Sequence, residues 1–495
     1  MPVNYKNSKT PGLLIVPVLC LILFAASLSI SSASTFVPVG DDTYEYLSIL
    51  EAEGVITSGM LSARPISRSE VVRLINEADE RSADRSLFIR SIVRSLKDRY
   101  SDDISGGYYF KALDSAGMEY SYADNDPDGF VYNNDGYGPV KGSNLRINAV
   151  TRLEHRNYSF YFEPEFRLSD DESILTLGRM YGAFMFGKLE IQAGKDSQWW
   201  GPGYHGAILL SNNAEPFTMV KLGNSTPFRL PWVFRHIGDT RITFFATRLE
   251  EDRAVPEPFL WGMRFDFKPS RYFEFGIHRT ALLGGEGRSS DLDTWWRSFL
   301  GEGEHVAGEP GDQRGGLDIK FSVPLSSQPF QVYGEVIGED SVGVLPEEFG
   351  FLAGLYLPRV SGFERLALRI EYSDNYWDLR NEPNVFYSHH LYTTGYTYDG
   401  EWVGHHMGSD STDMFIQISY LVPERDARVD ISYDLEKHGL STNNDWKEAE
   451  ISLRTKYRMA GNIELDCKYT YGLIYDTGSA EQELSLISIA LDYHF

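Results

Sequence analysis

The stretch ISIALDYHF, residues 487–495, decides which fold class the rest of the sequence is compared with. Successive side chains of a β-strand point to opposite faces, so every second residue shares a face. The residues between the apolar ones are small or polar, which gives the strand one apolar and one polar side. The apolar side is formed by Ile487, Ile489, Leu491, Tyr493 and Phe495.

The same two-residue alternation recurs in three other segments, residues 160–168, 259–267 and 429–435. In each, large apolar side chains occupy one face, and charged or small residues occupy most of the other. A soluble β-sandwich buries such an apolar face in a protein core, whereas a membrane barrel turns it toward lipid. A single strand does not separate the two folds.

An alternating strand that ends on Phe495 resembles the insertion signal of bacterial outer-membrane barrels. This resemblance implies outer-membrane lipid and the barrel insertion machinery as partners. The 30 tyrosines and 29 phenylalanines suit the aromatic girdles of such barrels. A buried edge strand in a soluble sandwich is the alternative interpretation of the same residues.

The predicted fold is all-β, a transmembrane outer-membrane barrel over residues 107–495. Almost every segment of this region is alternating or turn-like. Membrane strands need about 10 residues each, so the region holds roughly 16–18 antiparallel strands. A barrel of that size encloses an aqueous channel unless something fills it.

Residues 34–106 differ from the rest, because their apolar residues recur at three- and four-residue spacing, as in helices. Ser67 or Ser69 is suited to cap one of these helices, and Gly54 to close an earlier one. We expect a small helical domain at the periplasmic side, under or inside the barrel mouth. An independent helical module on a linker is the alternative.

Residues 1–33 are typical of a secretory signal peptide, with Lys6 and Lys9 before an apolar run and small residues at its end. We expect cleavage after Ala33 and a location in the bacterial outer membrane; a retained membrane anchor is the alternative. Cys467 is then the single cysteine of the mature chain, so no intramolecular disulfide is expected. The chain has 71 acidic and 46 basic residues, a charge balance that disfavours binding to nucleic acid.

The segment from residue 196 to 217, DSQWWGPGYHGAILLSNNAEPF, resembles the hallmark motif of the Wzi-type capsule assembly proteins. Weaker similarity to the same family is found at residues 387–411 and 63–78. The glycines and the proline of the motif suit a tightly folded connection, so we interpret it mainly as structural. The motif residues are Trp199, Trp200, Gly201, Pro202, Gly203, Asn212, Asn213 and Pro216.

Membership of that family would imply a barrel of about eighteen strands with a helical plug, acting as a lectin without catalysis. The expected function is therefore to bind and anchor capsular or exopolysaccharide at the cell surface, in contact with a polysaccharide export channel. Sugars stack on aromatic faces while carboxylates and amides bind their hydroxyls. Two predicted outer loops have this composition, and their candidate sugar contacts are Trp295, Trp296, Tyr376, Trp377, Tyr387, Tyr392, Tyr396, Tyr398 and Trp402.

No cofactor or metal is expected, although two patterns invite one. Adjacent histidines on a strand point to opposite faces, so at most one of each pair in this sequence faces a common ion. The acidic stretch at residues 124–135 has calcium-loop spacing but ends in aspartate instead of the usual glutamate. The two histidine pairs are His389, His390, His405 and His406.

Two other functions remain open at this stage. A barrel-embedded enzyme acting on surface glycan or lipid would need two carboxylates across a cleft, and Glu163 and Glu165 lie two residues apart. Alternating acids are also what any polar-lined barrel shows, so this indication is weak. A diffusion porin is the third function, and it would require an open lumen.

Overall fold

A computed structural model of the chain describes residues 33–170, 172–301, 311–342, 345–376, 386–442, 445–459, 462–476 and 482–495. Residues 1–32, most of the predicted signal peptide, lie outside the described residues. No helix found in the described ranges combines the length and the apolar character needed to cross a membrane.

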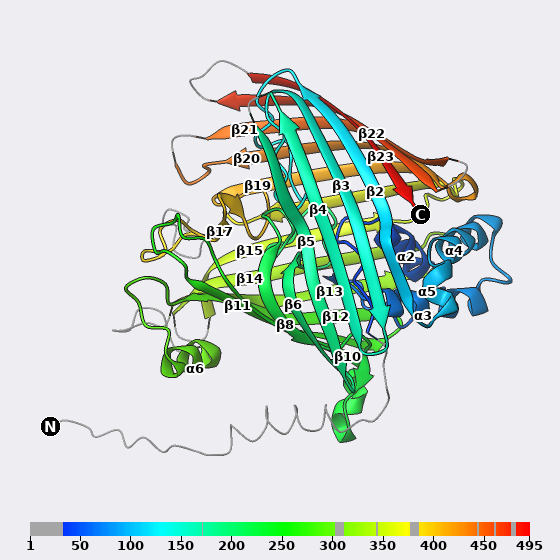
Figure 1. The fold of residues 1–495 in the computed structure, drawn as a ribbon, viewed down its shortest axis with the longest axis horizontal. Helices are drawn as coiled ribbons and strands as arrows, with labels where there is room; N and C mark the ends of the chain where they lie inside the picture. The colour runs from blue at the N-terminus through cyan, green and yellow to red at the C-terminus, as the bar shows by residue number, and fades with distance from the viewer. Residues whose placement is uncertain are drawn as a thin grey trace.

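The long strands form one closed antiparallel barrel, and within the described residues eighteen of them make up its wall (Figure 1). Neighbours in sequence pair with each other around the wall, and β23 closes it against β2. The prediction of 16–18 strands is confirmed. The strands are β2 (Tyr109–Ala123), β3 (Gly142–His155), β4 (Tyr158–Ser169), β5 (Ser173–Phe186), β6 (Leu189–Asp196), β8 (Phe217–Gly223), β10 (Asp239–Arg248), β11 (Phe259–Ser270), β12 (Phe273–Leu283), β13 (Gly311–Val323), β14 (Phe330–Val342), β15 (Leu345–Leu357), β16 (Leu366–Asp374), β19 (Ser411–Val422), β20 (Ala427–His438), β21 (Trp446–Met459), β22 (Ile463–Asp476) and β23 (Gln482–His494).

The two faces of each strand meet different surroundings. On β23, Ile487 and Ile489 point away from the lumen and are 47% and 44% exposed. On β11, the inward-facing Arg264 and Asp266 are completely buried and form an ion pair of 2.7 Å. A soluble sandwich would bury the apolar face and expose the charged one, so that alternative is wrong.

Four helices lie at the end of the barrel where β2 begins and β23 ends, which we call the inner end (Figure 1). Ser67 caps α3, its hydroxyl accepting a hydrogen bond from the Glu70 N–H at 3.2 Å. The helices are α2 (Thr43–Ala52), α3 (Arg68–Arg81), α4 (Leu87–Arg99) and α5 (Ser101–Ser105).

Ion pairs tie α2 and the residue before it to the inner face of the wall. Glu45 pairs with Arg369 at 2.7 Å, and Glu51 pairs with Lys320 at 2.9 Å. Asp42 pairs with Lys456 at 2.9 Å. These contacts place α2 within the lumen, so the helices form a plug that is attached to the wall by charge.

The connections at the opposite end, the outer end, include much longer segments than the two-residue turns 156–157, 187–188 and 271–272 at the inner end. Outer-membrane barrels have short periplasmic turns and longer extracellular loops, which fits this assignment of the two ends. The other short elements are β1 (Ala63–Arg64), β7 (Trp199–Trp200), β9 (Phe228–Arg229), η2 (Trp232–Ile237), α6 (Leu292–Leu300), β17 (Thr397–Tyr398), β18 (Glu401–Trp402) and η3 (Pro423–Arg425).

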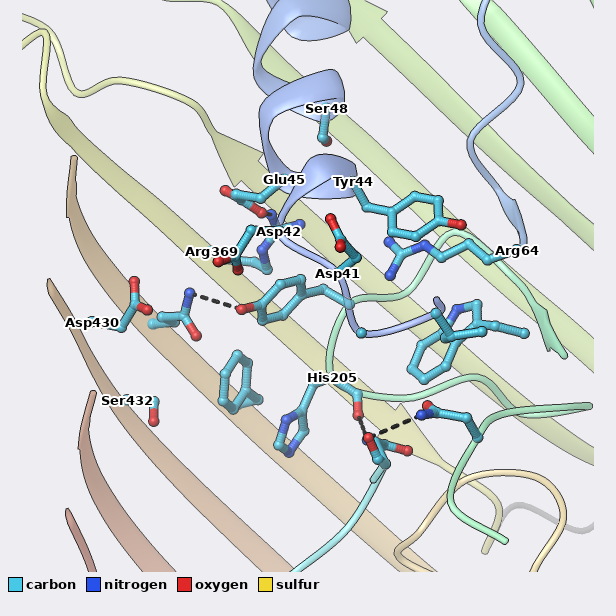
Figure 2. Close-up of a pocket in the computed structure, with 18 of the residues that line it drawn as sticks. Asp41, Asp42, Tyr44, Glu45, Ser48, Arg64, His205, Arg369, Asp430 and Ser432 are labelled. Carbon is cyan, nitrogen blue, oxygen red and sulfur yellow. Dashed lines mark hydrogen bonds and ion pairs between the residues drawn. The ribbon is translucent and has the colours of Figure 1, made fainter. Parts of the chain in front are cut away.

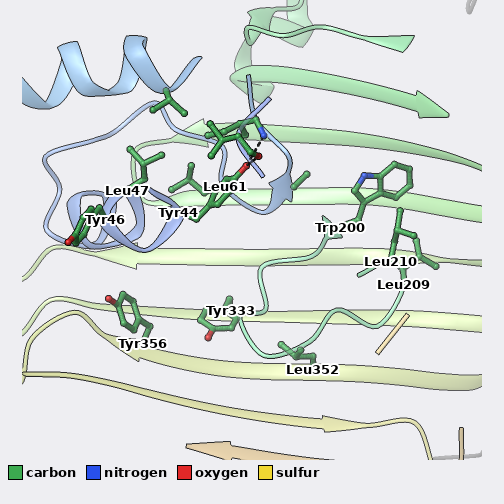
Figure 3. Close-up of a cluster of buried hydrophobic side chains, with 14 of the residues drawn as sticks. Tyr44, Tyr46, Leu47, Leu61, Trp200, Leu209, Leu210, Tyr333, Leu352 and Tyr356 are labelled. Atoms are coloured by element: carbon green, nitrogen blue, oxygen red, sulfur yellow. Dashed lines mark hydrogen bonds between the residues drawn. The ribbon is translucent and has the colours of Figure 1, made fainter. Parts of the chain in front are cut away.

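The apolar core of the protein lies inside the barrel, because the outer face of the wall is turned to lipid. Figure 3 shows Leu47 and Leu61 of the plug on one side and Trp200, Leu209 and Leu210 of an outer-end loop on the other. All five side chains are at most 6% exposed. The plug and the loop therefore meet within the barrel and fill that part of its lumen.

Candidate functional site

The segment 197–216, which we call the motif loop, starts at the outer end of β6 and folds into the lumen. Its strand β7 pairs with β1 of the plug, with Trp200 opposite Ala63. The Gly201 N–H donates to the carbonyl oxygen of Ser62 at 2.8 Å. Trp199 and Trp200 are 2% and 1% exposed. The two tryptophans thus lie at a two-strand junction between the plug and an outer loop.

Carboxylates of the wall hold the backbone of the motif loop. Glu335 accepts hydrogen bonds from the N–H groups of Ile208 at 2.9 Å and Leu209 at 3.2 Å. Glu371 does the same for Tyr204 at 2.7 Å and His205 at 2.8 Å. A buried carboxylate that accepts two N–H groups is a strong, charge-assisted contact.

The glycines of the motif are required by this close approach. Gly201 has a φ of +147°, and a Cβ there would come within 2.7 Å of a Glu335 carboxylate oxygen. A Cβ on Gly203 would come within 2.0 Å of the Gly206 carbonyl oxygen. A side chain at Gly201 would thus collide with the wall, and one at Gly203 would collide with the backbone of the motif loop itself.

The Asn-Asn pair joins the motif loop to two other outer loops. The Asn212 amide donates to the Asn133 carbonyl oxygen at 3.1 Å and to the Asp135 carboxylate at 3.0 Å. The Asn213 amide donates to the Trp402 carbonyl oxygen at 3.3 Å. Pro216, at the end of the loop, is buried. The geometry of the motif is that of an internal brace.

A polar cavity of about 250 Å³ lies between the plug and the motif loop (Figure 2). Tyr44 and Glu45 line it from the plug, and His205 lines it from the motif loop. Arg369 and Asp430 line it from the wall. The cavity is charged rather than apolar, and it lies within the barrel.

Three of the aromatic residues predicted to contact sugar are buried. Tyr387, Tyr392 and Tyr396 are at most 1% exposed, and each hydroxyl is used internally. The Tyr387 hydroxyl donates to the Ile208 carbonyl oxygen of the motif loop. Those of Tyr392 and Tyr396 donate to the Gly284 carbonyl oxygen at 3.0 Å and the Thr280 hydroxyl at 2.9 Å. These three buried side chains therefore hold the outer loops to one another and to the wall.

Trp295 and Trp296 lie on α6, which packs on the lipid-facing side of the wall. The Trp295 ring is 5.5 Å from that of Phe259, and the outward-facing Trp261 donates its indole N–H to the Ser298 hydroxyl at 3.1 Å. Trp296 is 38% exposed. The two tryptophans therefore lie beside the barrel rather than over its mouth.

The remaining predicted contacts lie on the loop between β16 and β19. Tyr376 is 41% exposed, while Trp377 lies outside the described residues. Tyr398 and Trp402 are half-buried on the hairpin formed by β17 and β18. The exposed tip of this hairpin is formed by Asp399, Gly400 and Glu401.

The hairpin tip carries crowded negative charge. Partial burial and the carboxylates of Glu250 and Glu215 raise the pKa of Asp399. Partial burial and Asp128 raise the pKa of Glu401. Carboxylates in this setting interact more favourably with neutral hydroxyl groups than with further anions, because an added negative charge would be repelled.

One group of histidines and acids in the described part of the chain has the spacing of metal ligands. The ligand atoms of His205, His406, Asp413 and Asp434 all lie within 4.8 Å of one another. Of the four histidines that the sequence pointed to, only His406 belongs to this group. Sequence reasoning missed the other three members because His205 and Asp434 are distant in sequence from His406 and Asp413, and the four side chains meet only inside the barrel.

The acidic residues that the sequence suggested for calcium binding or catalysis form internal hydrogen bonds and ion pairs instead. In the acidic stretch with calcium-loop spacing, Asp124 accepts the Ser485 N–H at 2.7 Å, whereas Asp135 accepts the Ser197 hydroxyl at 2.7 Å. Glu163 pairs with Arg179 at 2.8 Å, and Glu165 with Arg167 at 2.9 Å. Glu163 and Glu165 are at most 3% exposed.

A closed barrel with an apolar outer band, in which a helical plug and an inward-folded loop meet in the lumen, defines an occluded outer-membrane β-barrel. The chain belongs to the Wzi family: the family model described as capsule assembly protein Wzi matches residues 123–475. The resemblance predicted from the motif at residues 196–217 is thus confirmed.

Two known proteins illustrate this relationship. An uncharacterised 55.8 kDa protein of the cps region of Klebsiella pneumoniae is 28% identical over 331 residues, which is 64% of this chain and 60% of that relative. The solved structure of Wzi from Escherichia coli matches with a TM-score of 0.76 at 22% identity, covering 94% of this chain and all of that one. That protein is described as an outer-membrane protein involved in group 1 capsule assembly and a carbohydrate-binding β-barrel.

Proposed function

We propose that this protein binds capsular or exopolysaccharide and anchors it at the surface of the outer membrane. Membership of the Wzi family is the observation that carries the proposal. The similar barrel from Escherichia coli is described as carbohydrate-binding, which supports a glycan as the ligand. A polysaccharide export channel and the barrel insertion machinery are partners in the same proposal.

The proposed contact surface is the hairpin tip at the outer end together with the flanking aromatic residues Tyr398 and Trp402. Half-buried aromatic rings offer a face to the C–H surface of a sugar, and the carboxylates between them accept hydrogen bonds from its hydroxyls. The Trp402 ring stacks on the buried Tyr387 at 5.6 Å, so it is held in place before a ligand arrives. Preorganisation of this kind lowers the entropic cost of binding.

The other predicted aromatic contacts are left out of this surface for physical reasons. Tyr387, Tyr392 and Tyr396 are buried beneath it, and a buried ring offers no face to a ligand. Trp295 and Trp296 lie on the lipid-facing side of the wall, where amphipathic aromatic rings commonly meet the membrane interface. Tyr376 is exposed on the same loop and extends the proposed surface.

A binding function is favoured over catalysis by the state of Glu163 and Glu165, the two lumen carboxylates that the sequence pointed to. Glu163 also accepts a hydrogen bond from the Asn148 amide at 2.9 Å, in addition to its ion pair with Arg179. Such fixed, charge-paired acids line the wall and are not poised to exchange protons with a substrate. A porin function is disfavoured because the plug and the motif loop pack together inside the barrel.

Deletion of the gene tests the anchoring function. Polysaccharide is expected in the medium instead of on the cells, while the total amount made stays the same. The double variant Tyr398→Ala, Trp402→Ala should reproduce this release in a barrel that is still folded, as shown by its heat-modifiable mobility on gels. Tyr272→Ala, an exposed tyrosine at an inner-end turn, is the matched control and should retain polysaccharide. Unchanged retention in the deletion strain would contradict the proposal.

A further inference from the structure

The histidine–carboxylate group brings together four side chains from separate parts of the chain. His205 comes from the motif loop, His406 from the loop before β19, Asp413 from β19 and Asp434 from β20. His205 Nε2 is 2.9 Å from Asp434 Oδ2 and 3.6 Å from Asp413 Oδ2. His406 Nε2 is also 3.6 Å from Asp413 Oδ2. All four side chains are at most 6% exposed.

The charges around this group are not balanced in the way seen elsewhere in the lumen. Acids such as Glu45, Glu51 and Asp266 each have a lysine or arginine partner. In the described part of the chain, Asp413 and Asp434 form ion pairs with histidines alone. Buried carboxylates without a permanent cation are costly, so a bound cation would supply the charge that the sequence does not.

Two carboxylate oxygens of the group also lack hydrogen-bond partners. Asp413 Oδ1 and Asp434 Oδ1 are buried and make no hydrogen bond within the described residues, whereas His406 Nε2 lies 3.0 Å from Glu436 Oε1. Buried polar atoms are rarely left unsatisfied, and such atoms call for an explanation. An ion among them would satisfy these atoms together.

The rings of both histidines are held in position by aromatic packing. His205 stacks on Phe415 with ring centroids 3.8 Å apart. His406 stacks on Tyr132 at 4.1 Å, and Tyr132 also packs edge-on against His205 at 5.0 Å. Side chains fixed in this way keep their ligand atoms directed at one point, as a metal site requires.

We propose that His205, His406, Asp413 and Asp434 bind one divalent transition-metal ion of the zinc class. Two imidazole nitrogens and two carboxylate oxygens are a ligand set that zinc accepts, at metal–ligand distances of about 2.0–2.2 Å. Tetrahedral geometry then separates ligand atoms by roughly 3.4 Å. Three of the observed separations are 2.9–3.6 Å, and all the ligand atoms lie within 4.8 Å of one another, so the more distant atoms would move closer together on binding an ion.

The ion would connect the motif loop, the loop before β19 and the wall at a single point. His406 is four residues from Trp402, so the same ion would fix the base of the loop that carries the hairpin tip. Its role is structural, because all four ligands come from the protein and closed coordination leaves no position for a substrate.

Metal binding by the purified, detergent-solubilised chain tests the proposal without any polysaccharide. After chelator treatment and gel filtration, zinc titration should show one tight equivalent per chain and a raised melting temperature, whereas Mg²⁺ at the same concentration should produce neither. Cobalt(II) should give the intense visible absorption of a four-coordinate site. The double variant His205→Ala, His406→Ala should lose the bound zinc and the cobalt absorption.

The control is His389→Ala, His390→Ala, an adjacent pair in the same outer loop that does not belong to the group; it should keep both signals. Asp434→Asn provides a milder second variant and should weaken zinc binding at least tenfold while the barrel stays heat-modifiable. Absence of tight zinc binding in the unaltered protein would overturn the proposal. Equal binding by the unaltered protein and the His205, His406 double variant would overturn it as well.

Discussion

Replacing Trp200 with alanine would weaken the junction between the plug and the motif loop. The indole is 1% exposed and packs edge-on against Phe245 at 5.3 Å. It also lies over Gly262 of β11, where an added Cβ would meet the ring at 2.9 Å. Removing a buried tryptophan side chain costs about 3–5 kcal/mol, because apolar contacts are lost and a void remains.

This loss should act locally, because the strand ladder of the wall does not depend on the indole. A cost of 3–5 kcal/mol corresponds to a roughly 10²- to 4 × 10³-fold larger population in which the motif loop is released from the plug. Hydrogen exchange measured by mass spectrometry should therefore speed up by about that factor at residues 197–216 and 60–66. Exchange in the wall strands should stay slow.

A matched control is Trp232→Ala, since Trp232 is 88% exposed at the inner end and should leave both segments protected. Planar-bilayer recordings offer a second readout, in which the Trp200→Ala protein should show transient conducting openings that the unaltered protein lacks. If exchange at residues 197–216 is as slow in folded Trp200→Ala protein as in the unaltered chain, the motif loop is not held by this side chain.

Three further predictions follow from the plug and the outer loops. Burial alone would raise the pKa of Asp42, but Lys456 and a nearby arginine outweigh it and hold this pKa well below its usual range. Its stabilising contribution is therefore complete above the unfolded pKa of about 3.9 and is lost as the pH falls below it, so protease should reach the plug helices faster at pH 3 than at pH 7. Gly201→Ala should displace the Glu335 carboxylate and lower the melting temperature, whereas Gly138→Ala, at a loop position with no neighbouring atoms within 4 Å and no positive φ, should change it much less. Tyr396→Phe removes a hydroxyl that donates to a threonine of β12 and should cost about 1 kcal/mol in denaturant unfolding; no change would mean that the bond adds nothing.

Local sequence pattern was sufficient for the barrel itself. Residues 487–495 alternate in sequence and alternate in the structure, with Ile489 outside and Ser488 opposite Ser121 of β2. The reason is that a strand fixes the side of every residue by its position alone. The helical character of the segment before the barrel followed in the same way from its three- and four-residue spacing.

Local pattern was not sufficient for the outer loops. Tyr396 and Tyr398 look alike in the sequence, yet one is buried on a threonine of β12 and the other lies at the exposed hairpin. Trp295 has the composition of a sugar contact, but α6 packs on the outside of the wall. In loops, burial is set by contacts between segments distant in sequence, and no short-range period encodes it.

The amino-acid sequence by itself therefore determined the barrel, its polar lining and the family motif, because each of these depends only on residues that are close together in the sequence. Only the tertiary structure decided which aromatic residues reach the surface and which acids meet the histidines. His205 and Asp434 are 229 positions apart and become neighbours because closure of the wall carries β20 to the side of the lumen that the motif loop reaches.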